Sequence, residues 1–174
     1  MRLKQGLVHV ITGDGRGKTT SALGLAVRAS GRGLKCYIIQ FLKGFEYGEL
    51  LALKKLPDIV VKQFGRPGFV CRERPLQIDY EQARAGLDHA KEIIQSNVYD
   101  LVILDEINIA INYKLIPLEE VIELVKKKPA TVELILTGRY APKELIELAD
   151  YVTEMKEIKH PYQKGILARE GIEY

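Results

Sequence analysis

The chain has 174 residues, of which 47% are hydrophobic and 28% are charged, and its formal net charge is +3 at pH 7. This length and composition predict one domain, residues 1–174, with a core large enough to need no disulfides. The mild charge argues against a nucleic-acid binder and suits a protein that holds one polyanionic ligand, and no apolar run approaches the length needed to cross a membrane.

The first predicted elements surround a glycine-rich sequence. An apolar run at residues 7–12 predicts a strand, and a helical pattern covers residues 21–30. A strand, a glycine-rich turn and a helix start in this order direct backbone N–H groups and a helix N-terminus at one anion. Lys18 adds a charge for phosphate oxygens, and the Thr19 hydroxyl suits Mg²⁺. We therefore expect a phosphate-binding loop made of Gly13, Asp14, Gly15, Arg16, Gly17, Lys18, Thr19 and Thr20.

This loop is one residue shorter than the common phosphate-binding pattern. The pattern G-x-x-x-x-G-K-[ST] would need a glycine where this chain has Thr12. The alternative is a glycine-rich turn that carries an incidental Gly-Lys-Thr. A shortened loop can still cradle phosphates, with the phosphate chain placed unusually.

The next segments predict two strands and a long loop. Residues 35–41 resemble a buried strand, and residues 42–48 lie past its carboxyl end, where open parallel sheets place their ligands. Gln40 and Lys43 are thus candidates for the site, with a plain surface turn as the alternative. A short helix at 49–56 and a strand at 59–64 follow.

Residues 65–75 carry glycine, proline and several arginines without clear periodicity. A loop of this length in a compact domain is usually functional or disordered. Asp79 and Gln82 then resemble a helix-capping arrangement, and an apolar face predicts the helix that follows. That face consists of Ala83, Leu87, Ala90 and Ile94.

The second strong signal is an aliphatic strand at 101–104 that ends in Asp105 and Glu106. The carboxyl end of a buried strand would bring both carboxylates beside the phosphate loop. Carboxylate oxygens are the protein ligands that a Mg²⁺-nucleotide site needs. Acidic residues also open many helices, so the prediction depends on their combination with Lys18 and Thr19.

The remaining elements continue the alternation of strands and helices. We expect a helix from 118 to about 128, a strand at 132–137, a helix at 142–149, a strand at 151–155 and a polar tail at 159–174. Arg139 follows a strand and could bind a phosphate, although a solvated or ion-paired arginine is the alternative. The order predicts an α/β fold with a mainly parallel central sheet and helices on both faces.

The chain resembles the bacterial ATP:corrinoid adenosyltransferases, which have a RecA-like P-loop NTPase fold. The shortened loop is itself the form seen in this family. The resembling segments run in order across almost the whole chain; they are residues 13–20, 40–44, 101–106, 113–122, 137–139, 159–160 and 171–174.

The resemblance implies transfer of the 5′-deoxyadenosyl group of ATP to the cobalt of a reduced corrinoid, cob(I)alamin or a precursor, with release of triphosphate. Reduced cobalt is then the nucleophile, and the protein positions the substrates and neutralises the leaving group. In this interpretation Lys18 and the loop amides hold phosphates, while Arg139 also reaches them. Thr19 and Glu106 hold Mg²⁺, with Asp105 in support.

One departure from the family concerns the loop over the corrin. The family has Gly-Phe-x-Trp where this chain has Gly68-Phe69-Val70-Cys71, and the chain contains no tryptophan. These aromatics are associated with crowding the lower corrin face, which removes the axial base and eases reduction of cobalt. We expect Phe69 to perform most of this exclusion as a catalytic residue beside Lys18 and Glu106. Cys71 is expected to be a small apolar filler, with a redox role as the alternative.

The resemblance further implies a homodimer and a possible electron-donor reductase. The mild charge and the lack of a long apolar run predict no nucleic-acid or membrane partner. Two distant cysteines in no metal-ligand spacing suit a reducing cytoplasm. Two histidines, His9 and His89, are expected to be structural or surface groups rather than ligands, and the role of His160 stays open.

Three other classes of function remain as alternatives. A nucleoside kinase of the thymidine-kinase type shares the loop and the Asp-Glu strand end, but it usually carries a four-cysteine zinc ribbon. A nucleotide-driven DNA-binding module would need a basic groove with interleaved aromatics, whereas the basic residues here are dispersed. The third is a non-catalytic ATP-binding switch.

Overall fold

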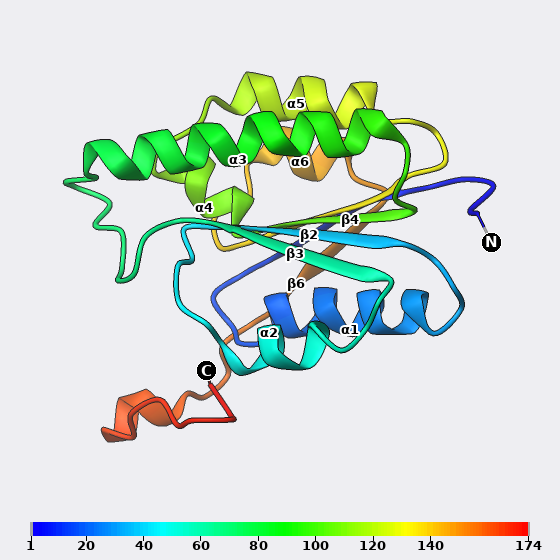
Figure 1. The fold of residues 1–174 in the computed structure, drawn as a ribbon. Coiled ribbons are helices and arrows are strands. Elements are labelled where there is room, and N and C mark those ends of the chain that lie inside the picture. Colours follow the sequence, from blue (N-terminus) through cyan, green and yellow to red (C-terminus); the bar gives the residue numbers. More distant parts are fainter. Residues whose placement is uncertain (1, 174) are drawn as a thin grey trace.

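The computed structural model describes residues 2–173 and has a parallel sheet at its centre (Figure 1). The six strands lie in the order β3-β2-β4-β5-β1-β6, and each neighbouring pair is parallel. The predicted α/β class with a mainly parallel sheet is thus confirmed. The strands are β1 (Val8–Thr12), β2 (Cys36–Phe41), β3 (Ile59–Phe64), β4 (Leu101–Asp105), β5 (Glu133–Thr137) and β6 (Tyr151–Glu154).

Helices cover both faces of the sheet, as Figure 1 shows. On one face lie α1 (Lys18–Ser30) and α2 (Gly48–Leu53). On the opposite face lie α3 (Gln77–Ser96), α4 (Ile107–Asn112), α5 (Leu118–Lys127) and α6 (Lys143–Leu148). Because both faces are covered, the central strands are apolar along their whole length rather than alternating. No helix within residues 2–173 is long and apolar enough to span a bilayer.

The core consists of two layers, one on each side of the sheet. Successive side chains of a strand point to opposite faces, so Val102 packs toward α3 while Ile103 packs toward α1. Both residues are fully buried. The α3 side of the core contains the predicted apolar face of that helix, including Leu87 and Ile94.

The strand order brings the carboxyl ends of four strands together at one edge of the sheet. Ile11 of β1 is in register with Thr137 of β5, and Gln40 of β2 is in register with Asp105 of β4. Loops that leave these ends therefore meet in one place, which is where parallel sheets bind ligands.

Two helices begin earlier than the sequence indicates. Helix α1 starts at Lys18 rather than at residue 21, after Gly17 adopts a left-handed φ of 112°. Helix α3 starts at Gln77, so the predicted capping pair lies inside it, with Asp79 in the first turn and Gln82 beyond it. Asp79 does cap the helix, because its carboxylate accepts the backbone N–H of Leu76 at 2.8 Å. The predicted partnership with Gln82 is wrong.

Helix α4 has no counterpart in the sequence prediction. It follows β4 after the single residue Glu106, which has a left-handed φ of 64°. The polar tail is also more structured than expected, since residues 161–164 form a 3₁₀ helix (Pro161–Lys164). In Figure 1 this tail extends below α1 and α2, away from the sheet.

Candidate functional site

The phosphate loop (residues 13–20) connects β1 to α1 and packs against the chain that leaves β6. Gly13 has a φ of 96°, a left-handed angle that favours glycine. A Cβ atom at Gly13 would collide with the Met155 carbonyl, and one at Gly15 would lie 2.7 Å from backbone atoms of Lys156. The Gly15 N–H donates to the Met155 carbonyl at 2.7 Å. These two glycines therefore leave room for the backbone of residues 155 and 156.

Lys18 is buried at the start of α1, and its ammonium folds back over the loop. Its Nζ donates to the Gly15 carbonyl at 2.6 Å. Burial lowers the pKa of Lys18, and the nearby Glu106 carboxylate opposes this effect. The ammonium thus lies beside the loop amides, where it can meet a phosphate.

Asp105 is fully buried at the end of β4 and accepts four hydrogen bonds from side chains. Its Oδ1 accepts from the hydroxyls of Thr19 at 2.8 Å and Thr137 at 2.6 Å. Its Oδ2 accepts from Lys43 Nζ at 2.7 Å and Gln40 Nε2 at 3.1 Å. Gln40 and Lys43, predicted only as neighbours of the site, thus both hold Asp105.

Glu106 carries a buried oxygen without a hydrogen-bond partner. Its backbone N–H donates to the Thr137 hydroxyl at 3.1 Å, while its Oε2 is buried and makes no hydrogen bond. Burial raises the pKa of Glu106, and the charge of Asp105 raises it further. A buried carboxylate oxygen without a hydrogen-bond partner lowers the stability of the fold unless a ligand binds to it.

The oxygens of Thr19, Asp105 and Glu106 form a set of hard donors, the kind that Mg²⁺ prefers. Within residues 2–173 there is no cluster of three or more His, Cys, Asp or Glu side chains arranged to hold a metal. A cation here would therefore share its coordination with a hydroxyl and with oxygens of a bound ligand. The unpaired Oε2 of Glu106 fits this arrangement.

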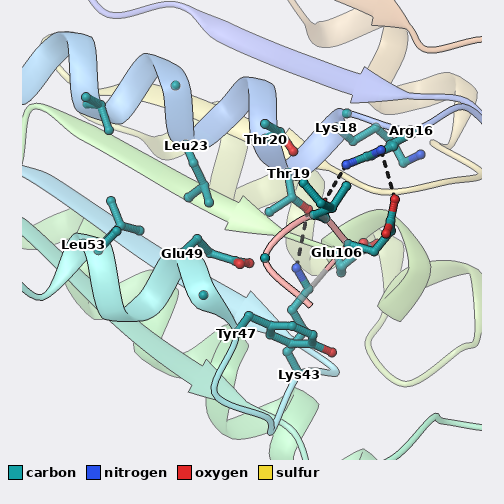
Figure 2. Close-up of a pocket in the computed structure, with 18 of the residues that line it drawn as sticks. Arg16, Lys18, Thr19, Thr20, Leu23, Lys43, Tyr47, Glu49, Leu53 and Glu106 are labelled. Atoms are coloured by element: carbon teal, nitrogen blue, oxygen red, sulfur yellow. Dashed lines mark hydrogen bonds and ion pairs between the residues drawn. The ribbon is translucent and has the colours of Figure 1, made fainter. Parts of the chain in front are cut away.

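Two cavities meet at the phosphate loop. The first, of about 730 Å³, lies between α1, α2 and the end of the chain (Figure 2). The second, of about 530 Å³, extends from the loop to Phe69, Tyr113 and Arg139. The walls of both cavities include Arg16, Lys18, Lys43, Tyr47, Glu106 and His160.

Phe69 and Arg139 both border the second cavity. The Phe69 side chain is 95% exposed, so it has almost no contact with its own chain. Arg139 donates from Nη2 to the Asp14 carbonyl at 3.2 Å, which brings it against the phosphate loop. Cys71 is exposed and lies 3.4 Å from Glu73, so it fills no gap within the chain itself.

The end of the chain is tied to the phosphate loop, which sequence reasoning missed. Arg16 donates to the Ile172 carbonyl at 2.6 Å and to the Glu173 carboxylate at 3.2 Å. Gly171, Ile172 and Glu173 thereby form part of the wall of the first cavity. The only sequence signal was the resemblance of residues 171–174 to the family, which gave no location; Tyr174 lies outside the described residues.

The histidines divide as expected. His9 Nε2 lies 2.5 Å from Glu133 Oε1, and His89 Nε2 lies 2.7 Å from the Tyr37 hydroxyl, both away from the cavities. These contacts support the expectation that both are structural or surface groups rather than ligands. His160 borders both cavities instead, a location that sequence reasoning left open.

Comparison with known proteins identifies the family. Residues 4–174 match the family model for the ATP:corrinoid adenosyltransferase BtuR/CobO/CobP. A corrinoid adenosyltransferase from a Sinorhizobium species is 38% identical over 174 residues, which cover 98% of this chain and 81% of the relative. Those from Escherichia coli strain K12 and Salmonella typhimurium strain LT2 are 37% and 36% identical, each over 98% of this chain and 87% of the relative. The chain therefore belongs to the ATP:corrinoid adenosyltransferases, a family of enzymes.

Proposed function

We propose that this protein transfers the 5′-deoxyadenosyl group of ATP to the cobalt of a reduced corrinoid and releases triphosphate, with one domain holding both substrates. Family membership supports the reaction. The structural observation that carries it is the pair of cavities of about 730 and 530 Å³ that meet at Lys18, Lys43 and Glu106. A reaction between two large substrates needs two such spaces with a common wall, since proximity supplies much of the rate.

In this proposal the phosphate loop binds the triphosphate. The amides at the start of α1 and the Lys18 ammonium offset its negative charge, and Arg139 reaches it from the end of β5. Thr19, Asp105 and Glu106 would hold Mg²⁺, which when bound neutralises charge on the leaving phosphates. Glu106 Oε2 is buried without a hydrogen-bond partner, and a bound metal would supply the missing interaction. This is the structural reason to assign Glu106 to the metal.

The second cavity would receive the corrinoid. The electron pair of reduced cobalt attacks the ribose 5′-carbon, and the bond from that carbon to the triphosphate oxygen breaks with its electrons on oxygen. No side chain has to be a nucleophile. Exposed Phe69 borders this cavity and is assigned to exclude the lower axial base of the corrinoid.

The test is anaerobic incubation of the protein with MgATP and chemically reduced cobalamin. We expect photolabile adenosylcobalamin together with triphosphate. Lys18→Ala should abolish both products, whereas Lys54→Ala, which removes an exposed lysine paired with Glu46, should change neither. Release of ADP or phosphate without a change in the corrinoid spectrum would contradict the proposal and favour a nucleoside kinase or ATPase.

We also propose that the protein acts as a homodimer that receives electrons from a separate reductase in the cytoplasm. The support is the family resemblance together with the free state of Cys36 and Cys71, which suits a reducing compartment. Light scattering coupled to gel filtration tests the oligomeric state. A monomer at micromolar concentration would contradict the dimer and leave the reaction untouched.

A further inference from the structure

The Lys43 ammonium lies where a cation between Asp105 and Thr19 would lie. Its Nζ is 2.7 Å from Asp105 Oδ2 and 3.4 Å from Thr19 Oγ1. Figure 2 shows the side chain pointing toward Thr19 and the loop, past the Tyr47 ring. The Lys43 side chain is 16% exposed and borders both cavities.

Charge balance explains this position. The Asp105 side chain is 1% exposed, and a carboxylate so deeply buried requires a positive partner. Lys18 does not serve, because its ammonium is bonded to the Gly15 carbonyl. Among the salt bridges of residues 2–173, Asp105 pairs with Lys43.

The backbone around Lys43 is held by contacts with the loop that follows β3. The Leu42 N–H donates to the Phe64 carbonyl at 2.8 Å. A Cβ atom at Gly44 would collide with the Arg66 backbone, so the two loops are in direct contact. Only the flexible four-carbon stem of Lys43 can therefore carry its charge to a new place.

We propose that Lys43 is a positioning residue that occupies the cation position beside Asp105 and Thr19 until ATP brings a divalent metal. This inference rests on the proposed function, because it assigns the same site to the metal. When the metal displaces the ammonium, the phosphates that arrive with it supply a new counter-charge in the adjoining cavities. Metal and nucleotide then enter together, and a divalent cation alone binds poorly.

The experiment measures metal binding without nucleotide or corrinoid. Mn²⁺ is titrated into the full-length protein, and free Mn²⁺ is followed by electron paramagnetic resonance. We expect wild type and Lys43→Arg to bind Mn²⁺ weakly, and Lys43→Met to bind one equivalent at least about tenfold more tightly, a difference of about 1.4 kcal/mol. Lys54→Met is the matched control, because Lys54 also contacts a carboxylate at 2.7 Å but on the exposed surface.

Two further measurements keep the proposal testable. Mn²⁺ should raise the melting temperature of Lys43→Met but not that of wild type, and adding Asp105→Asn to Lys43→Met should remove the tight binding. Micromolar Mn²⁺ binding by nucleotide-free wild type would overturn the proposal, even if the Lys43→Met variant proved unstable. So would a folded Lys43→Met variant that binds no better than wild type. The metal-binding experiment contains no corrinoid, so its result does not depend on whether the protein transfers the adenosyl group. A failure of the proposed reaction can therefore be distinguished from a failure of this inference.

Discussion

At the scale of single residues, Phe69 borders the second cavity with almost all of its surface exposed. An aromatic ring that is 95% exposed contributes little to folding. Phe69→Ala should therefore leave the melting temperature and ATP affinity unchanged and lower kcat/KM for the corrinoid by about tenfold or more, the equivalent of at least about 1.4 kcal/mol of transition-state binding. Steady-state kinetics with reduced cobalamin measures this.

A matched control for Phe69→Ala is Ile158→Ala, because Ile158 is 82% exposed and borders neither cavity. That variant should keep wild-type kinetics. If Phe69→Ala adenosylates cobalamin at the wild-type rate, the ring does not crowd the corrinoid. The variant Cys71→Trp, which restores the tryptophan found at this position in the family, should then be tested for crowding of the corrinoid.

Several of the residues that the structure brings together around the phosphate loop were predicted from the sequence, but their contacts were not. The spacing around Lys18 and the carboxylates after β4 indicated a phosphate and metal site, and the structure brings them together. The bond from Lys43 to Asp105 depends on β2 lying next to β4, and the sequence does not give the strand order. The hydrogen bonds from Arg16 to the end of the chain join residues that lie even farther apart in the sequence.

At the scale of elements, Asp79 connects α3 to the loop that carries Phe69. Its carboxylate accepts from Arg66 Nε at 2.8 Å as well as from the Leu76 N–H. Asp79→Ala removes a helix cap and leaves a partly buried guanidinium unpaired, so we expect the free energy of unfolding to fall by about 2 kcal/mol. Urea denaturation measures it, with Asp88→Ala as a control on the same helix.

The same substitution should raise KM for the corrinoid, because Arg66 also donates to the Phe69 carbonyl and so holds the loop. Asp79→Asn, which keeps an oxygen for the Leu76 N–H, should lose less stability than Asp79→Ala. Equal stability of wild type and Asp79→Ala would show that the cap and the ion pair are replaced by solvent at no cost.

His89 of α3 contacts the Tyr37 hydroxyl of β2, and this partly buried histidine predicts a pH dependence of the free energy of unfolding. Burial lowers the pKa of His89, and the nearby Lys62 charge lowers it further. The unfolded chain, with a histidine pKa near 6.5, then binds more protons than the folded chain as the pH falls below that value. Stability contributed by neutral His89 is therefore complete above about pH 6.5 and declines as the pH falls.

Replacement by a residue that does not titrate tests this dependence. His89→Gln should melt with a flatter profile than wild type between about pH 7 and pH 5, since its side chain gains no charge. Differential scanning calorimetry across this range measures the slope. Identical slopes for the two proteins would mean that other groups govern the acid transition.

Most of the elements were predicted from the sequence, including the short helices α2 and α6, whereas α4 was missed. Helix α3 was recognised from its apolar face, although its start was misplaced because Asp79 caps from within the first turn. Helix α4 escaped notice because a single left-handed residue, Glu106, separates it from β4. No turn signal stands at that position, since glutamate rarely adopts a positive φ.

At the scale of the whole molecule, the alternation of strands and helices was sufficient to predict the fold class but not the strand order. Parallel strands joined by right-handed crossovers allow several orders with the same element sequence. The course of the chain after β6 was equally hidden, because its bonds to the phosphate loop are made by isolated residues. Arg169 and Arg16 both pair with Glu173, which holds this segment beside the first cavity.

Removal of that pairing should loosen the end of the chain without unfolding the protein. We expect Glu173→Ala to be cut by trypsin faster than wild type after Lys164, with an unchanged melting temperature, because exposed ion pairs contribute little to global stability. Mass spectrometry of timed digests measures the rates. Glu170→Ala, a change at an exposed residue of the same segment outside this pairing, should be cut at the wild-type rate.

The position of β1 has a consequence for synthesis of the protein. Its neighbours in the sheet are β5 and β6, so the strand that precedes the phosphate loop pairs only with the last two strands. A chain emerging from the ribosome therefore displays the complete loop sequence long before the loop has its supporting strands. Nucleotide binding should arise at the end of translation, in one late step that joins the first strand to the last.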